Sequence, residues 1–157
     1  MYRRILVPVD GSATSKLGLR HALGLARDQR ARVRVLNVLD DTVLASMIDG
    51  YPAGDMTLLI DSLRASGNKA LEEASALAKK ARVEVNTAMV EARGRPVSDL
   101  ILADARKFGA DLIVMGTHGR RGLNRLLLGS DAERVLRQAS VPVLLVRAQQ
   151  AERRRKT

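Results

Sequence analysis

The sequence has no cysteine, no tryptophan and few aromatic side chains of any kind, which are Tyr2, Tyr51 and Phe108. Without cysteine the chain has no disulfide framework, no thiol nucleophile, no thiolate zinc site and no iron–sulfur cluster. The two histidines, His21 and His118, stand too far apart in sequence to form a helical metal-binding pair. A length of 157 residues is enough for one domain with a hydrophobic core that needs no covalent support.

Long apolar runs are absent as well. The stretch Ile5–Val9 follows two arginines, as in a signal peptide, but it ends at Asp10 and is far shorter than a secretory core. No uncharged apolar run approaches the length that spans a bilayer. We therefore expect a cytoplasmic protein that makes no contact with membranes.

Basic residues are in excess, with 27 Lys and Arg against 17 Asp and Glu. Residues 1–34 carry eight basic and two acidic side chains and residues 147–157 carry five and one, whereas residues 35–115 carry nine and twelve. A basic chain favours anionic partners. Because the charge is divided between segments and aromatic residues for base stacking are scarce, we expect a small phosphate ligand, with nucleic acid unfavoured. We expect one domain over residues 1–147, followed by a basic, disordered tail at 148–157.

Apolar and alternating runs predict five strands, which are Ile5–Val9, Arg32–Leu39, Val83–Met89, Leu112–Met115 and Val143–Val146. Helical periodicity between the strands predicts four helices, with faces within Ser15–Ala26, Met56–Ala81, Val97–Phe108 and Ala132–Ala139. We expect a loop over residues 42–55, a weak point at Gly67 in the second helix, and an end to the third helix at Gly109.

Serine residues mark the expected starts of the first and last helices. Ser12 is the predicted N-cap of the first helix, and Ser130 forms a capping-box pattern with Glu133 at the start of the last. Behind that box, we expect the last helix to bury a stripe that includes Val135 and Leu136.

Strands that alternate with helices predict an α/β fold, namely a single-domain doubly wound (Rossmann-like) five-stranded parallel sheet with helices on both faces. The expected strand order is 3-2-1-4-5. In such a sheet ligands bind at the carboxyl ends of the strands where the strand order reverses, here between strands 1 and 4. The segments that meet there are Asp10–Ser12 and the loop that begins at Gly116.

The loop after the fourth strand is rich in glycine and leads into a helix. It contains Gly116, Gly119, Gly122 and Gly129, and it ends at Ser130. Glycines allow a close backbone approach, and the N–H groups at a helix start attract anions, so this loop favours a phosphate ligand. The chain has no Walker A sequence, because no Gly-Lys pair occurs in it.

The pattern Gly-x2-Gly-x9-Gly-Ser at Gly116, Gly119, Gly129 and Ser130, with the opening run Ile5–Ser12 and the closing run 141–147, resembles the universal stress protein family. In that family the complete pattern marks the branch that binds ATP. The resemblance therefore implies ATP and Mg²⁺ as ligands, with the Mg²⁺ held through the ATP phosphates and not by direct protein ligands.

The same resemblance implies roles for individual residues. Asp10 would hold the ribose, the backbone near Val38 and Leu39 would meet the adenine edge, and the glycines would cradle the phosphates. The full set of implied cofactor-binding residues is Pro8, Val9, Asp10, Val38, Leu39, Met115, Gly116, Thr117, His118, Gly119, Arg120, Gly129, Ser130 and Asp131. Asp131 departs from the small apolar residue often found there, and its carboxylate would repel phosphates unless Arg120, Arg121 and Arg125 offset it or it helps to hold the metal ion.

We therefore expect a cytoplasmic stress-response protein that binds ATP and acts as a regulatory dimer with slow or no hydrolysis. Neither a nucleophile elbow nor a clear water-activating base is present. The alternative is a dimeric protective or interaction protein that works without nucleotide. In both readings the homodimer forms through the edge strand of Val143, Leu144, Leu145 and Val146.

Overall fold

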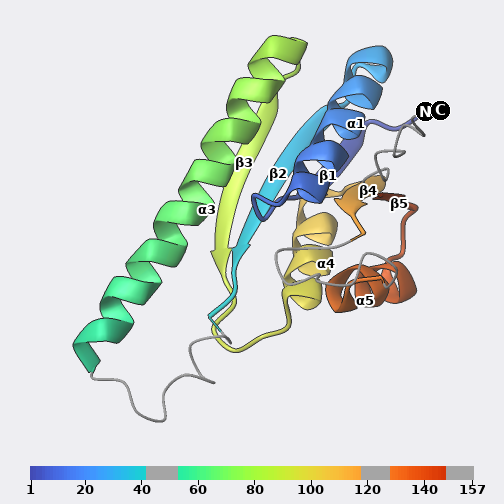
Figure 1. Ribbon diagram of the computed structural model, residues 1–157. Coiled ribbons are helices and arrows are strands. Elements are labelled where there is room, and N and C mark those ends of the chain that lie inside the picture. Colours follow the sequence, from blue (N-terminus) through green and yellow to red (C-terminus); the bar gives the residue numbers. More distant parts are fainter. Residues whose placement is uncertain (42–52, 118–127, 148–157) are drawn as a thin grey trace, which may run out of the picture.

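The computed structural model describes residues 1–41, 53–117 and 128–147, with backbone alone over 53–56 (Figure 1). Its strands form one five-stranded parallel sheet and are β1 (Arg4–Pro8), β2 (Arg32–Leu39), β3 (Val85–Glu91), β4 (Leu112–Gly116) and β5 (Val143–Val146). The strand order is β3-β2-β1-β4-β5, so the predicted topology is confirmed. The apolar character of β1 and β4 explains their central positions, because strands at the centre of a parallel sheet are buried on both faces.

Helices cover both faces of the sheet (Figure 1). They are α1 (Ala13–Gln29), α3 (Ala53–Ala81), α4 (Val97–Phe108) and α5 (Ser130–Gln138). Ile5 and Val7 of β1 pack with α1 and α3 in one core, whereas Leu6 packs with α4 and α5 in the other. No helix in the described part of the chain is long and apolar enough to cross a membrane.

The boundaries of two elements differ from the sequence expectation. Helix α3 begins at Ala53 and runs without a break through Gly67, so the expected weak point does not interrupt it. Most of the expected loop, residues 42–52, lies outside the described residues. Strand β3 begins at Val85, later than predicted, because the Arg82 and Val83 amides still bond to carbonyls of the last turn of α3.

The helix ends confirm one predicted cap and correct another. Ser12 caps α1, since its Oγ accepts a hydrogen bond from the Ser15 N–H at 3.2 Å. Ser130 is not a cap. Gly129 is the N-cap of α5 and accepts a hydrogen bond from the Glu133 N–H at 2.9 Å, which makes Ser130 the first helical residue.

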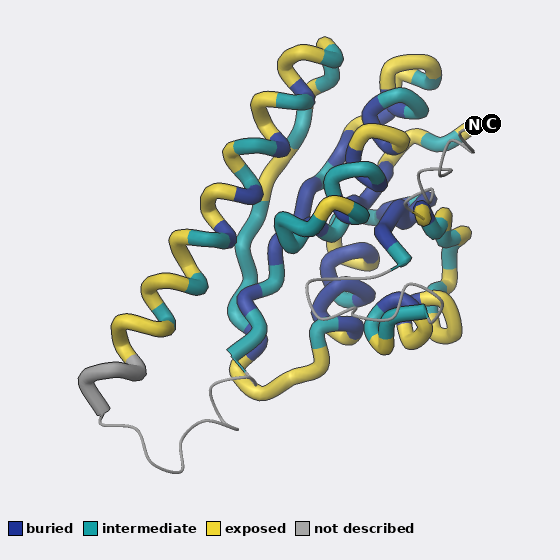
Figure 2. The backbone as a smooth tube through the Cα atoms, in the orientation of Figure 1, coloured by how far each residue is buried: buried dark blue, intermediate teal, exposed yellow. Residues whose placement is uncertain are grey.

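Helix α5 also buries less than expected. Ala132 and Val135 are its buried residues, whereas Leu136 is 47% exposed. Figure 2 shows that burial also differs along α3, whose half nearer the amino terminus is largely exposed while the other half packs on the sheet. The buried positions of that second half are Ala70, Ala74 and Ala78, whose small side chains let α3 lie close to β2 and β3.

Candidate functional site

The central strand of the sheet ends before both of its neighbours, and this creates a notch. Pairing between β1 and β2 ends at Pro8 and Leu36, although β2 continues alongside β3 to Leu39. On the other side β4 continues alongside β5 to Gly116. The carboxyl ends of β2 and β4 therefore flank a gap that β1 has left, which is the position predicted for a ligand from the strand order.

A cavity of about 390 Å³ occupies this notch. From the side of β1 and β2 it is lined by the predicted residues Pro8, Val9, Asp10, Val38 and Leu39. From the side of β4 and α5 it is lined by the predicted residues Met115, Gly116, Thr117, Gly129, Ser130 and Asp131. The remaining predicted residues, His118, Gly119 and Arg120, lie outside the described part of the chain.

Hydrogen bonds hold the turn between β1 and α1 in one shape. The Asp10 Oδ1 accepts a bond from the Ser12 N–H at 2.9 Å, and the Asp10 N–H donates to the Ser15 Oγ at 3.4 Å. The Ser15 hydroxyl in turn donates to the Ser12 carbonyl at 3.0 Å. This closed set fixes the half-buried Asp10 carboxylate at the rim of the cavity.

The backbone of β2 presents Val38 to the notch. The Leu36 carbonyl accepts the Val9 N–H at 2.8 Å, so Leu36 faces β1, whereas the Leu39 carbonyl accepts the Ala92 N–H at 2.9 Å and faces β3. Because backbone groups alternate between the two sides along a parallel strand, the N–H and C=O of Val38 point to the side of β1, where β1 has already left the sheet. A donor and an acceptor of one residue thus face the cavity together.

A buried amide that the sequence reasoning missed also belongs to this site. Asn37 is 4% exposed and lines the cavity, and its Nδ2 donates a hydrogen bond of 2.8 Å to the Val9 carbonyl. Both backbone polar groups of Val9, its N–H and its C=O, are therefore bonded to β2, directly before Asp10. The available signal was a polar residue inside an otherwise apolar run after Val35, since such residues are rarely buried without a partner.

The glycine at the end of β4 also allows close packing against α1. A Cβ added at Gly116 would lie 2.9 Å from the carbonyl carbon of Thr14 and 3.0 Å from its Cβ. A Cβ at Gly18 would lie 3.4 Å from the Gly116 nitrogen. These glycines bring the first turns of α1 against the end of β4, and so they place the Asp10 turn and the β4 loop on opposite sides of one cavity.

The start of α5 closes the cavity on the side of β4. Gly129 donates its N–H to the Thr117 carbonyl at 2.9 Å, which ties the end of the loop to the end of β4. Gly129, Ser130 and Asp131 line the cavity at the positive end of the α5 dipole. Within the described ranges, no group of three or more His, Asp or Glu side chains could hold a metal ion.

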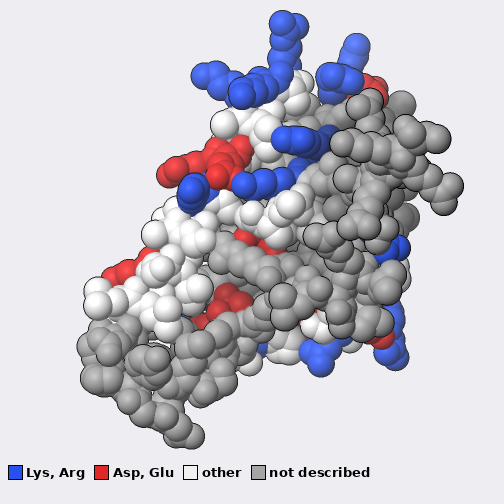
Figure 3. All heavy atoms as spheres, viewed as in Figure 1, with Lys and Arg blue, Asp and Glu red and all other residues white. Residues whose placement is uncertain are grey.

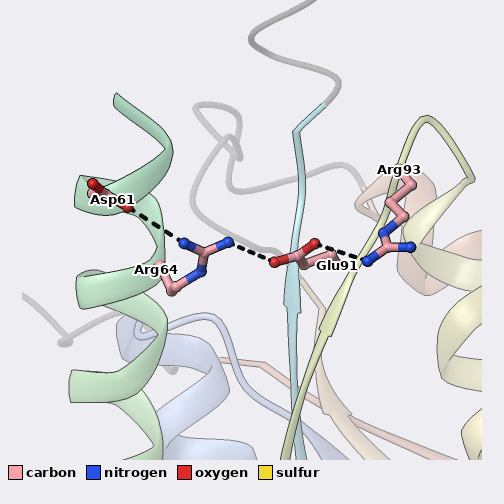
Figure 4. A network of polar contacts seen from close by, with 4 residues as sticks. All are labelled: Asp61, Arg64, Glu91 and Arg93. Carbon is pink, nitrogen blue, oxygen red and sulfur yellow. Dashed lines mark hydrogen bonds and ion pairs between the residues drawn. The ribbon is translucent and has the colours of Figure 1, made fainter. Parts of the chain in front are cut away.

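Helix α3 supplies a further wall that the sequence did not predict. Leu63 and Gly67 line the cavity, and Figure 4 shows how the adjacent part of α3 is attached to the end of β3. The Arg64 Nη2 lies 2.7 Å from Glu91 Oε1, and the other Glu91 oxygen lies 3.5 Å from Arg93 Nη2. The hydrogen bond between Arg64 and Glu91 raises the pKa of Arg64 and lowers the pKa of Glu91 from their ordinary values.

Comparison with known proteins agrees with this arrangement. The model of the universal stress protein family matches residues 1–147. Universal stress protein MJ0531 of Methanocaldococcus jannaschii is 39% identical over 153 residues, which cover 97% of this chain and 86% of that protein.

Solved structures extend the same similarity to three dimensions. A universal stress protein family structure from Burkholderia pseudomallei is 36% identical with a TM-score of 0.74, and the match covers 94% of this chain and 97% of that one. The universal stress protein of Archaeoglobus fulgidus in complex with dAMP is 26% identical with a TM-score of 0.68, and the match covers 93% of this chain and 98% of that one.

Proposed function

This chain belongs to the universal stress protein family, and from that premise we propose that it binds an adenine nucleotide, ATP with Mg²⁺, in the cavity between the β1 and β4 loops. The observation that carries the proposal is the notch left by β1, where Asp10, the backbone of Val38 and the start of α5 face one volume of about 390 Å³. A related protein in complex with dAMP supports the class of ligand.

The base is assigned to the β2 side of the cavity. The N–H and C=O of Val38 match the neighbouring acceptor and donor on the edge of adenine, at N1 and the N6 amino group. Around them the cavity is largely apolar, with Leu39, Ile101 and Met115 available to contact the faces of a ring. Apolar walls with a few directed polar groups are the usual composition of a nucleoside pocket.

The sugar and the phosphates are assigned to the other parts of the rim. The Asp10 carboxylate is an acceptor suited to ribose hydroxyls, and its turn holds it in place before the ligand arrives. Phosphates lie at the start of α5, where Gly129 and Ser130 line the cavity and the helix dipole favours negative charge. Mg²⁺ takes its ligands from the phosphates, and Asp131, which lines this end of the cavity, is the side chain placed to assist it.

We assign to the bound nucleotide a regulatory role with slow or no turnover, in a cytoplasmic dimer. In the described part of the cavity, the acidic residues Asp10, Asp40 and Asp131 are its titratable side chains. The described lining of the cavity includes no histidine, the side chain most often used as a general base.

Calorimetric titration tests this proposal. ATP, ADP and AMP are each titrated into the protein with and without Mg²⁺, and we expect saturable heat with a stoichiometry of one per chain. Asp10→Ala should weaken the binding of ribonucleotides more than that of 2′,3′-dideoxy analogues, because only the former offer hydroxyls to the lost carboxylate. Asp28→Ala, an exposed change near the end of α1, is the matched control. Absence of heat for every nucleotide at millimolar concentration would rule the proposal out.

A second candidate, a dimeric interaction protein that needs no nucleotide, is favoured by an apolar surface at one side of the sheet. Leu144 in β5 is 38% exposed and Leu136 in α5 is 47% exposed, on two elements that pack together. β5 is an edge strand, and an apolar edge is prone to pair with a second copy. Leu144→Lys should convert the dimer to a monomer in sedimentation velocity, with Leu58→Lys on α3 as the control. A protein that sediments as a monomer without any substitution contradicts this candidate.

A further inference from the structure

Basic side chains gather at the amino-terminal edge of the sheet, on the side opposite to the cavity. The first group lies at the ends of α1 and α3, where Figure 3 shows Lys and Arg gathered at the top of the view. Its members are exposed and are Arg27, Arg30, Lys79, Lys80 and Arg82. The ends of α1 and α3 are neighbours, because these two helices pack side by side on one face of the sheet.

A second group lies at the starts of the strands and at the end of α4. Arg4 opens β1 and Arg32 opens β2, and the two are direct partners in the pairing of these strands. Arg3, Arg106 and Lys107 complete the group, and all five side chains are exposed. We call the two groups together the basic edge.

Acidic residues compensate little of this charge. Asp28 lies 3.3 Å from Arg27, and Asp111 accepts hydrogen bonds from the backbone N–H groups of Arg3 and Arg4 and not from their guanidinium groups. Glu84 is the other acidic residue at this edge. Within residues 1–41, 53–117 and 128–147, the side chains of Arg30, Arg32 and Arg82 take part in no ion pair. The basic edge as a whole has ten basic side chains and, with Asp28, Asp111 and Glu84, three acidic ones.

Two of these arginines occupy a backbone conformation that favours glycine. Arg30, directly after α1, has a φ of 55°, and Arg82, directly after α3, has a φ of 56°. At the same point after α4 the chain has Gly109, with a φ of 64°. Because the left-handed conformation is unfavourable for residues with a Cβ, arginine at these two turns lowers stability relative to glycine.

The strand arginines show a second unfavourable arrangement. Arg4 and Arg32 are like charges at directly paired positions, which destabilises a sheet. In β2, two residues after Arg32, Arg34 has a carboxylate partner, since its Nε and Nη2 donate to Asp104 at 2.6 and 2.9 Å. A basic residue in the body of the sheet is thus neutralised, whereas those at the edge are not. Helix dipoles do not account for Arg4 and Arg32, which belong to strands.

We propose that the basic edge is a second binding surface, which takes the phosphodiester backbone of double-stranded nucleic acid without reading its sequence. Arginine forks pair bidentately with phosphate oxygens, and a row of them suits a repeating polyanion. Single-strand binding relies on aromatic stacking, but of the aromatic residues that the structure describes, Tyr2 packs against the core and Phe108 is partly buried in it. An anionic membrane surface requires apolar anchors, and among the described large apolar residues Met1 alone is exposed near this edge.

The fold is what makes this inference possible. Sequence position separates the basic residues into segments around residues 3, 30, 80 and 106, and the parallel sheet brings the corresponding turns to one edge. The basic edge lies at the opposite end of the strands from the cavity. We therefore expect duplex binding and adenine nucleotide binding to be independent, so that losing one leaves the other unchanged.

Fluorescence anisotropy with a labelled duplex of random sequence tests the proposal on the full chain. We expect binding that weakens steeply with salt. The variant Arg30→Gly with Arg82→Gly removes two charges and relieves two unfavourable backbone conformations. It should therefore keep or raise the melting temperature, yet weaken duplex binding about tenfold and reduce the salt slope by about 1.8, as expected for two lost phosphate contacts.

Controls separate the surface from net charge and from the tail. Arg134→Gln with Arg137→Gln removes the same charge from α5 and should leave affinity within about twofold. The proposal is overturned if the unaltered chain does not bind the duplex at low salt, or if the α5 variant weakens binding as much as the edge variant. It is also overturned if neutralising Arg153–Arg155 abolishes binding while the edge variant does not, or if vesicles with anionic lipid bind the edge more tightly than the duplex does.

Discussion

At the scale of single residues, Asn37 and Gly67 connect α3 with the candidate nucleotide site. A Cβ added at Gly67 would lie 2.5 Å from Asn37 Oδ1 and 2.8 Å from Met89 Cε. Glycine at this position lets the helix backbone approach the amide that holds the Val9 carbonyl. A residue that lowers helix propensity is therefore kept inside α3 by close packing.

Gly67→Ala should displace the Asn37 amide and weaken adenine nucleotide binding. We expect a loss of roughly 1 kcal/mol in unfolding free energy as well, since overpacking exceeds the gain in helix propensity. Gly24→Ala in α1 is the matched control, because an added Cβ there meets no atom within 4 Å and should raise stability by about 0.5 kcal/mol. Chemical unfolding and calorimetry of both variants check this, and equal stabilisation of both would contradict it.

At this scale the sequence predicted the ends of elements where the signal is local. Asp10 follows the apolar run of β1, and Gly109 ends the helical pattern of α4. The prediction failed for Ser130, because the capping-box pattern of Ser130 and Glu133 does not exclude an N-cap at Gly129. Gly129 adopts the N-cap conformation without strain, at φ −64°. Asn37 was missed because its value lies in a contact with Val9, which is distant in sequence.

At the scale of elements, one buried ion pair joins β2 to α4. The side chains of Arg34 and Asp104 are 19% and 8% exposed, and Arg34 also donates to the Asn86 side chain on β3. The hydrogen bond with Asp104 raises the pKa of Arg34 above its ordinary value. The pair thus fixes α4 over the β2 and β3 side of the sheet with matched charges.

Asp104→Leu should leave the Arg34 charge without its partner and destabilise the fold by about 3 kcal/mol. The double variant Arg34→Met with Asp104→Leu should recover most of that loss, because two apolar side chains of similar volume fill the space without a charge. Urea unfolding of the single and double variants measures the difference. If the double variant is as unstable as the single one, the pair does not act as a matched unit.

Two exposed ion pairs hold α3 and make stability depend on pH at the acid end. Lys16 lies 2.6 Å from Glu73 and lowers its pKa below 4.5 through a hydrogen bond, as Arg64 does for Glu91. A carboxylate with a lowered pKa in the folded state contributes stability above its unfolded pKa, and that contribution is lost as pH falls through the folded value.

Removing both carboxylates should therefore flatten the acid limb of the stability profile. We expect the melting temperature of Glu73→Gln with Glu91→Gln to be lower than that of the unaltered chain at neutral pH. The two should converge as pH falls below 4.5. The neutral-pH difference is small, because exposed pairs contribute little. Two curves that stay parallel down to acid unfolding would show that these pairs are not responsible.

The elements themselves were largely predictable, because each strand is a short apolar run and each helix has a periodic face. Their boundaries were less so. Helix α3 begins at Ala53, before the expected start at Met56, so neither Gly54 nor Asp55 ends the helix there. The exposure of Leu136 could not be predicted, because α5 packs with only a narrow face.

At the scale of the whole molecule, the parallel sheet separates two kinds of surface. The carboxyl ends of the strands meet at the cavity, and their amino ends meet at the basic edge. The strand order was predictable from the alternation of strands and helices, and so was the position of the cavity. The gathering of the basic residues was not, because they come from segments that are distant in sequence and that only the completed sheet brings together.

Nuclear magnetic resonance with amide-resolved spectra is the most direct test of the central claim, that the notch left by β1 binds an adenine nucleotide. On addition of AMP or of ATP with Mg²⁺, the backbone signals of Asp10, Val38, Gly116 and Gly129 should shift together and saturate. The signals of Arg30 and Arg82 at the opposite edge should stay in place. No shifts at millimolar nucleotide, or shifts confined to residues away from the notch, would contradict the account.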